Sequence, residues 1–142
     1  TLLGLSDAGA HTSQLCDACF ATHLLGHWVR DKGVLPVEEA VRKLTSLPAD
    51  VFGLTGRGRL AVGGPADVVI FDPDTIAAGK LRRVTDLPGG EERLVSESTG
   101  IEAVIVNGAM LRNADGDVLS DDAPLPGALL RNGAAREWSK AV

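Results

Sequence analysis

The chain opens on an apolar run that ends in an acid. Residues 2–6 read Leu-Leu-Gly-Leu-Ser, Asp7 follows directly, and small residues lead on to His11. A continuous apolar run, instead of an alternating one, is typical of a parallel strand that is buried on both faces. In α/β barrels the catalytic groups lie where such strands end. The pattern therefore predicts a strand over residues 2–6 and a candidate catalytic carboxylate at Asp7.

Helical patterns follow the predicted strand. Over residues 15–30 apolar side chains recur on two sides of a helix, so this helix is expected to be well buried, with its end at Lys32-Gly33. A second helix is predicted from Pro36, because proline fits the first helical turn. Its apolar stripe consists of Val37, Ala40, Val41 and Leu44. A last short turn of helix is expected over residues 48–53.

After Gly53 the pattern changes from helical to β. Strands are predicted over residues 66–72 and 101–106, and Asn107-Gly108 after the second strand is a strong hairpin signal because both turn residues must adopt positive φ. Residues 74–100 show no clear period and are expected to be irregular, with a turn at residues 87–90. The chain is accordingly divided into residues 1–55 and 56–142.

Composition narrows the classes of protein that fit this pattern. The chain has 142 residues, of which 44% are hydrophobic and 23% charged, as in an ordinary globular protein. The net charge of −5 argues against a nucleic-acid partner. The apolar runs are shorter than the ~18 residues that a membrane span requires, so no membrane association is expected.

Several further residue patterns have both a chemical and a structural interpretation. Cys16 and Cys19 form a C-x-x-C, but without a second ligand pair we favour reduced thiols packed in a helix, which suggest a cytoplasmic protein. His23 and His27 are four residues apart, as in zinc-binding helices, yet Leu24 stands where a metalloprotease motif needs Glu, so structural histidines are favoured. For Arg82-Arg83, a solvated surface pair is favoured over an anion site.

The motifs in their order resemble the amidohydrolase superfamily. The stretches 6–11, 28–30 and 39–49 resemble the end of the barrel of these enzymes, and 58–72 and 105–108 resemble the loop and strands that follow it. Two stretches, 86–90 and 126–131, resemble the branch of N-acyl-D-amino-acid deacylases (D-aminoacylases). The resemblance covers nearly the whole chain.

The resemblance implies an α/β plus β fold. Residues 1–55 would form the C-terminal end of a (β/α)8 barrel, with residues 2–7 as its last strand and two closing helices. Residues 56–142 would form the C-terminal part of a composite β-sandwich and the tail. The remainder of the barrel would then be this chain's partner, so the chain is expected to be an inactive C-terminal fragment that self-associates in isolation, as a homo-oligomer or in aggregates.

The resemblance also implies a metal-dependent hydrolase of small linear amides, with a divalent metal, zinc, as cofactor. It assigns Asp7 as the general acid/base for a metal-bound water and as a metal contact, and the alternative is an Asp that caps the loop. His11 corresponds to a histidine that binds the substrate carboxylate in cyclic-amide members, and the alternative is a solvated loop histidine. The sequence contains no His-x-His, so the other ligands would lie outside it.

Two other functions remain open from the sequence. One is a cyclic amidohydrolase similar to hydantoinase or dihydroorotase, with the same fold and another substrate. The other is a non-catalytic truncated module, which the absence of further metal ligands favours.

Overall fold

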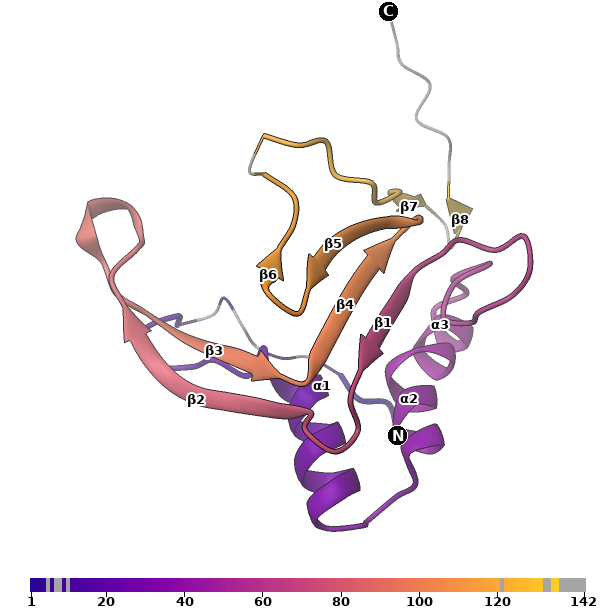
Figure 1. Cartoon of the computed structure of the whole chain (residues 1–142), viewed down its shortest axis with the longest axis horizontal. Helices are drawn as coiled ribbons and strands as arrows, with labels where there is room; N and C mark the ends of the chain where they lie inside the picture. Colours follow the sequence, from indigo (N-terminus) through magenta and orange to yellow (C-terminus); the bar gives the residue numbers. More distant parts are fainter. Residues whose placement is uncertain (5, 7–8, 10, 121, 132–133, 136–142) are drawn as a thin grey trace, which may run out of the picture. The chain divides into compact units, whose positions relative to one another are not determined.

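Segments distant in the sequence come together in the computed structural model, which describes residues 1–4, 6, 9, 11–120, 122–131 and 134–135. Unit 1 consists of Thr1–Leu2, Val41–Phe71 and Ile101–Val142, and unit 2 of Leu3–Ala40 and Asp72–Gly100. The chain therefore passes more than once between the two units (Figure 1). Each helix in the described ranges is too short or too polar to cross a bilayer.

The first helix of unit 2 begins later than its apolar pattern predicts. It starts as α1 (Phe20–His23) and continues as the π-helix η1 (Leu24–Asp31), whereas the sequence predicts a helix from Leu15. The residues before it include a loop whose Thr12 and Ser13 carbonyl groups bind the β2–β3 hairpin described below. Gly33, with a φ of 59°, lies just past the end of η1, as predicted.

This helix is also less buried than the sequence suggests. Phe20 and Trp28 remain 38% and 44% exposed, so the expectation of a well-buried helix is wrong at these two positions. The helix packs on strand β2 (Ala77–Val84). Its buried residues are Leu24, Leu25 and Gly26.

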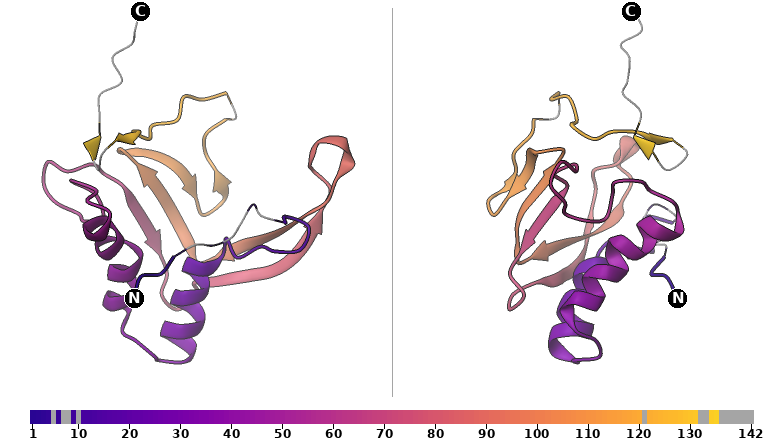
Figure 2. Two further views of the ribbon diagram at one scale, coloured as in Figure 1. Left: turned by 180° about the vertical axis from the view of Figure 1, so that it is seen from behind. Right: turned by 90° about the vertical axis from the view of Figure 1, so that its right-hand side faces the viewer.

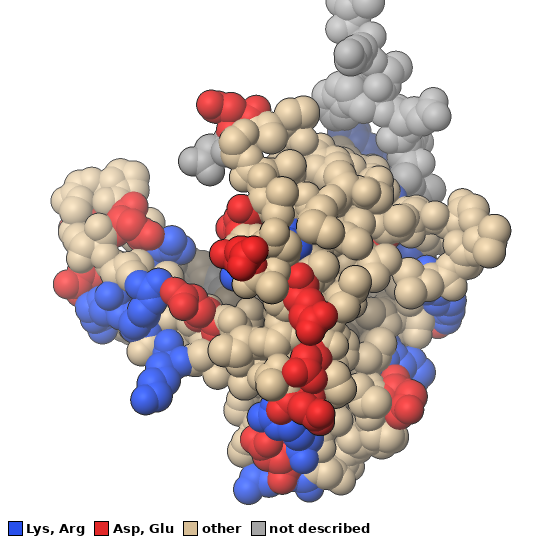
Figure 3. Space-filling view, in the orientation of Figure 1, with Lys and Arg blue, Asp and Glu red and all other residues tan. Residues whose placement is uncertain are grey.

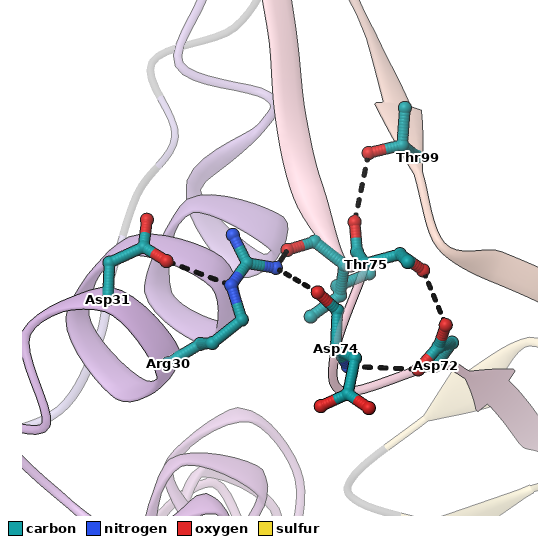
Figure 4. A network of polar contacts seen from close by, with 7 residues as sticks. Arg30, Asp31, Asp72, Asp74, Thr75 and Thr99 are labelled. Carbon is teal, nitrogen blue, oxygen red and sulfur yellow. Dashed lines mark hydrogen bonds and ion pairs between the residues drawn. The ribbon is translucent and has the colours of Figure 1, made fainter.

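Gly26 and Arg30 join the helix to the chain that enters β2. A Cβ on Gly26 would overlap the carbonyl oxygen of Ile76 and stand 3.2 Å from the Cα of Ala77. One turn further, Nη1 of Arg30 donates to the carbonyl oxygens of Asp74 at 3.2 Å and Ile76 at 2.6 Å (Figure 4). Ile76, only 1% exposed, is thus held by the close approach of the Gly26 backbone and by the hydrogen bond from Arg30 to its carbonyl oxygen.

Asp72 shapes the turn that leads into β2. Its Oδ1 accepts the N–H of Asp74 at 2.9 Å and its Oδ2 accepts the hydroxyl of Thr75 at 2.7 Å, while Thr99 donates to the Thr75 carbonyl at 3.1 Å (Figure 4). The hydrogen bonds from Thr75 and from the Asp74 N–H hold the pKa of Asp72 below its ordinary value. This carboxylate therefore has a structural role in the turn.

A β-hairpin occupies most of the segment expected to be irregular, and that prediction is wrong. β2 and β3 (Arg93–Thr99) pair antiparallel, with the 3₁₀ turn η2 (Pro88–Gly90) in the turn predicted at residues 87–90. The register shifts between Ala78 and Leu81, which breaks the alternation of apolar and polar residues. Gly79 lies at the shift, where a Cβ would stand 2.5 Å from the carbonyl oxygen of Glu97.

The two later helices form as predicted. α2 (Val37–Leu44) carries acids in its first turn and cations in its last, which complement the helix dipole, and Ala40 of its apolar stripe is fully buried. α3 (Ser46–Val51) lies in unit 1 and corresponds to the short turn expected at residues 48–53.

A four-stranded antiparallel sheet forms the β part of unit 1, in the order β1-β4-β5-β6 (Figure 1). Its strands are β1 (Val68–Phe71), β4 (Ile101–Val106), β5 (Ala109–Asn113) and β6 (Gly116–Asp117). The turn between β4 and β5 has φ values of 47° at Asn107 and 80° at Gly108, so the predicted hairpin is confirmed. A separate pair consists of β7 (Leu130–Arg131) and β8 (Ala134–Ala135).

The apolar run at the start of the chain is not a strand in its described part, residues 1–4 and 6. A parallel strand is defined by hydrogen bonds to its neighbours, and the strands present here pair antiparallel with one another. The strand predicted over residues 2–6 is therefore wrong for this chain taken alone.

Asp67, just before β1, holds the β4–β5 turn. Its Oδ1 accepts the N–H of Asn107 at 2.8 Å, and its Oδ2 forms an ion pair with Arg57. The Asn107 hydrogen bond, followed by the Arg57 interaction, keeps the pKa of Asp67 below its ordinary value. The charged carboxylate therefore stabilises the folded state.

The free energy of unfolding of the Asp67→Asn variant is expected to be lower than that of wild type by on the order of 1 kcal/mol at neutral pH. The loss is modest because the carboxylate is 38% exposed. Since the folded pKa is lowered, this stabilisation is complete above the unfolded pKa of about 3.9 and disappears as the pH falls through the folded value. Urea denaturation over this pH range measures the difference. Asp117→Asn, which removes a 77% exposed carboxylate from the same sheet, serves as control. A difference from wild type that did not shrink in acid would contradict the assignment.

Candidate active site

Of the two predicted site residues, Asp7 lies outside the described residues and His11 lies within them. His11 is exposed and has a φ of 50°, a left-handed conformation that few residues other than glycine adopt. Its carbonyl oxygen accepts the N–H groups of Gln14 at 2.7 Å and Leu15 at 3.0 Å. These bonds define a compact turn over residues 11–15, here named the His11 loop.

The His11 loop is bound to the β2–β3 hairpin of the same unit (Figure 2). The N–H of Leu94 donates to the Thr12 carbonyl at 2.8 Å, and Nη1 of Arg83 donates to the Ser13 carbonyl at 3.0 Å. Arg83 also forms an ion pair with Glu92 at 3.3 Å. The interpretation of Arg83 as a purely solvated residue is therefore wrong, since its guanidinium binds a loop 70 positions earlier in the chain.

A cavity of about 350 Å³ lies between this segment and β3. Gly9, Thr12, Leu15 and Cys16 line one side, and residues 93–96 line the other. Arg93 in its wall donates through Nε and Nη2 to the two carboxylate oxygens of Asp86, both at 2.7 Å. This pairing lowers the pKa of Asp86 and raises that of Arg93. The positive charge in the cavity wall is thus paired with an acid.

The charged side chains of the hairpin are mostly paired with one another. Arg82 pairs with Glu97 across the two strands, in addition to the pairs of Arg83 and Arg93. Over the hairpin in Figure 3, basic side chains accordingly lie next to acidic ones. This surface has little net charge with which to attract a polyanion.

The cysteine and histidine pairs have structural surroundings. Cys16 and Cys19 are free thiols, with Cys16 buried and the Cys19 sulfur 4.0 Å from the Cys16 carbonyl oxygen. Both precede α1, so their predicted place in a helix is wrong. The rings of His23 and His27 stack with centroids 4.9 Å apart, and Trp28 meets the His27 ring edge-on at 4.9 Å. In the described part of the chain, no three His, Cys, Asp or Glu side chains gather where they could hold a metal. These residues by themselves do not fit a metal centre.

A second cavity, of about 390 Å³, lies in unit 1 beside the glycine-rich loop over residues 53–64. The arginines in its lining are engaged: Arg59 binds both carboxylate oxygens of Asp50, at 2.8 and 2.7 Å, and Arg57 pairs with Asp67. The pKa of Asp50 is lowered by the hydrogen bond from Arg59. The loop thus uses its cations for internal pairs, which favours a structural turn over an anion site.

Sequence reasoning missed the hairpin residues that hold the His11 loop. Arg83 and Leu94 lie in a segment without a strand period, and their targets are backbone carbonyl groups, which every residue has. The pair of adjacent arginines was the one available signal for them.

Comparison with known proteins extends this picture. The sequence model of the amidohydrolase family matches residues 2–112. An N-acyl-D-glutamate deacylase of Alcaligenes xylosoxydans xylosoxydans is 44% identical over an alignment of 113 residues, and the match covers 75% of this chain and 21% of that protein. A D-aminoacylase of the same organism is 44% identical over 86 residues, 61% of this chain and 16% of the relative.

A solved structure is similar as well. The crystal structure of N-acyl-D-glutamate deacylase from Bordetella bronchiseptica, complexed with zinc and a phosphonate inhibitor, matches with a TM-score of 0.50 and 43% identity. The match covers 63% of this chain and 17% of that chain. The chain therefore spans about a fifth of the length of the proteins that it resembles.

Proposed function

The chain belongs to the amidohydrolase family, and from this membership we infer that it is part of a metal-dependent enzyme that deacylates N-acyl-D-amino acids. The observation that carries the proposal is the 44% identity to an N-acyl-D-glutamate deacylase over three quarters of the chain. Because the chain spans about a fifth of that relative, the activity belongs to the full-length protein that contains it.

In this proposal residues 1–55 belong to a (β/α)8 barrel and residues 56–142 to a β-sandwich and tail. Residues 2–7 acquire strand pairing only beside the other barrel strands. This arrangement accounts for an apolar run that is not a strand in the chain alone. The isolated chain is then an incomplete and inactive part of the enzyme.

Asp7 is the proposed proton-transfer group. Hydrolysis of a linear amide requires that a water lose a proton as it attacks the carbonyl carbon and that the leaving nitrogen gain one. A carboxylate at the end of the apolar run can accept the first proton and deliver it to the nitrogen. His11, four residues later on an exposed loop, is proposed to bind the substrate carboxylate.

A divalent metal, zinc, is the proposed cofactor, as in the related deacylase solved with zinc. Such an ion acidifies water and polarises carbonyl groups. Asp7 lies outside the described residues, and those residues gather no ligand set of their own, so the proposal takes the other ligands from the remainder of the full-length protein.

An assay of substrate class tests the proposal. The full-length, metal-loaded enzyme is expected to hydrolyse N-acyl-D-amino acids with a kcat/KM at least ~100-fold above that for hydantoins, because a site built for an open-chain substrate leaves its polar groups unpaired with a ring. Preference for hydantoins would instead support the cyclic amidohydrolase. Inactivity of the full-length, metal-loaded protein towards both classes would support the non-catalytic module.

A further inference from the structure

We propose that the β2–β3 hairpin positions the substrate-binding His11 loop, with Arg83 as the positioning residue. This inference rests on the proposed function, because it assigns a role to His11 in binding substrate. It adds a residue far from the predicted catalytic segment in sequence, in a part of the chain whose pattern suggests no function.

The geometry of the contact carries the inference. Arg83 on β2 and Leu94 on β3 are direct cross-strand partners in the hairpin register. One rung of the hairpin therefore supplies both donors, the Leu94 N–H and the Arg83 guanidinium, to the successive carbonyl groups of Thr12 and Ser13. Two bonds from a single rung fix both the position and the direction of the loop backbone.

The loop itself needs such support. The left-handed φ of His11 is costly for a residue with a side chain and persists only where the surroundings enforce it. The turn bonds from Gln14 and Leu15 to the His11 carbonyl hold the loop from within, and the hairpin bonds to Thr12 and Ser13 attach it to the rest of the unit. Removal of the Arg83 donor leaves the Ser13 carbonyl to solvent and loosens the turn that contains His11, which then keeps the Leu94 bond to the hairpin.

Arg83 is itself held in place for this contact. Glu92 pairs with its guanidinium at 3.3 Å, which orients the donor within the hairpin. The neighbouring Arg82 pairs with Glu97 instead. Because successive side chains of a strand point to opposite faces, Arg82 offers a control of the same charge, strand and degree of exposure.

The test uses the full-length, zinc-loaded enzyme with N-acetyl-D-glutamate as substrate. Arg83→Ala is expected to raise KM about three- to tenfold, as loss of one hydrogen bond in a substrate-binding loop would. The kcat of this variant should stay within about twofold of wild type, because the change weakens substrate binding and leaves the chemical step intact. Arg83→Lys, which retains a donor, should recover most of the loss, and Arg82→Ala should leave KM unchanged.

A double-mutant cycle decides whether Arg83 acts through His11. If it does, adding Arg83→Ala to His11→Ala raises KM little further, whereas full additivity of the two changes would overturn the proposal. An equal rise in KM for Arg82→Ala would overturn it too, since it would indicate a general effect of hairpin charge.

Hydrogen exchange gives a readout that does not depend on activity. The amides of Gln14 and Leu15 should exchange faster in Arg83→Ala than in wild type and in Arg82→Ala. Unchanged exchange and unchanged KM in an active enzyme would refute the role of Arg83. A wild-type enzyme without deacylase activity would refute the proposed function, while the exchange data would still decide whether Arg83 holds the loop.

Discussion

Asp7→Asn is expected to lower kcat by roughly 10²- to 10⁴-fold in the full-length enzyme, the range that a positioned proton-transfer group contributes. The amide has the size and shape of the carboxylate, but it cannot accept the proton of the attacking water or return one to the leaving nitrogen. Steady-state kinetics with an N-acyl-D-amino acid measure the loss. KM should change much less than kcat, because the lost interaction belongs to the transition state.

The bound-metal content of the variant separates the two roles assigned to Asp7. Loss of activity with metal retained identifies the proton-transfer role, and parallel loss of metal and activity identifies a ligand. Asp17→Asn makes the same chemical change at an exposed position ten residues later and should leave kcat unaffected. Full activity in an Asp7→Asn enzyme that is folded and metal-loaded would refute the catalytic assignment.

The second large effect concerns stability. Gly26→Ala is expected to destabilise the fold by about 2–3 kcal/mol, because the new methyl group meets the backbone oxygen of Ile76 and backbone yields less easily than a side chain. This loss exceeds the gain of about 1 kcal/mol that alanine normally brings to a helix interior. The midpoint of urea denaturation, at constant m-value, reports the change.

Gly127→Ala is the matched control, since a Cβ there has open space and no positive φ to strain it. It should shift the midpoint by much less than Gly26→Ala. A neutral or stabilising Gly26→Ala would show that η1 and the chain before β2 are not held as closely as the structure indicates.

The elements that the sequence predicts correctly are those specified by neighbours in the chain. The stripe from Val37 to Leu44 is complete within one helix, and Asn107-Gly108 encodes its own turn. In both cases a few adjacent residues contain the whole signal, so no distant contact can override it.

The elements that the sequence missed depend on distant partners. β2 carries a glycine at a register shift and charged residues whose partners lie far along the chain, as in the pair of Arg82 with Glu97. The helix expected from Leu15 begins only at Phe20, and the loop before it bonds to Arg83 and Leu94. No local period records such contacts.

The candidate site was predictable in part. An apolar run that ends in an acid singled out Asp7, and its role stays a prediction because the residue lies outside the described ranges. For His11 the structure shows an exposed loop, in line with the loop that the sequence suggested, and adds a left-handed backbone, which the sequence did not indicate. The residues that hold this loop emerged only from the fold.

One further consequence follows from the way the chain leaves and re-enters the four-stranded sheet. It departs after Phe71 and returns at Ile101, and these two residues are register partners in β1 and β4. The N–H of Asp72 donates to the Gly100 carbonyl at 2.9 Å, so the two ends of the intervening segment meet. For the sheet, residues 72–100 are therefore an insertion whose two ends are hydrogen-bonded to each other. We expect the turn around residues 88–90, at the far end of the hairpin, to tolerate insertions and deletions at little cost in loop entropy.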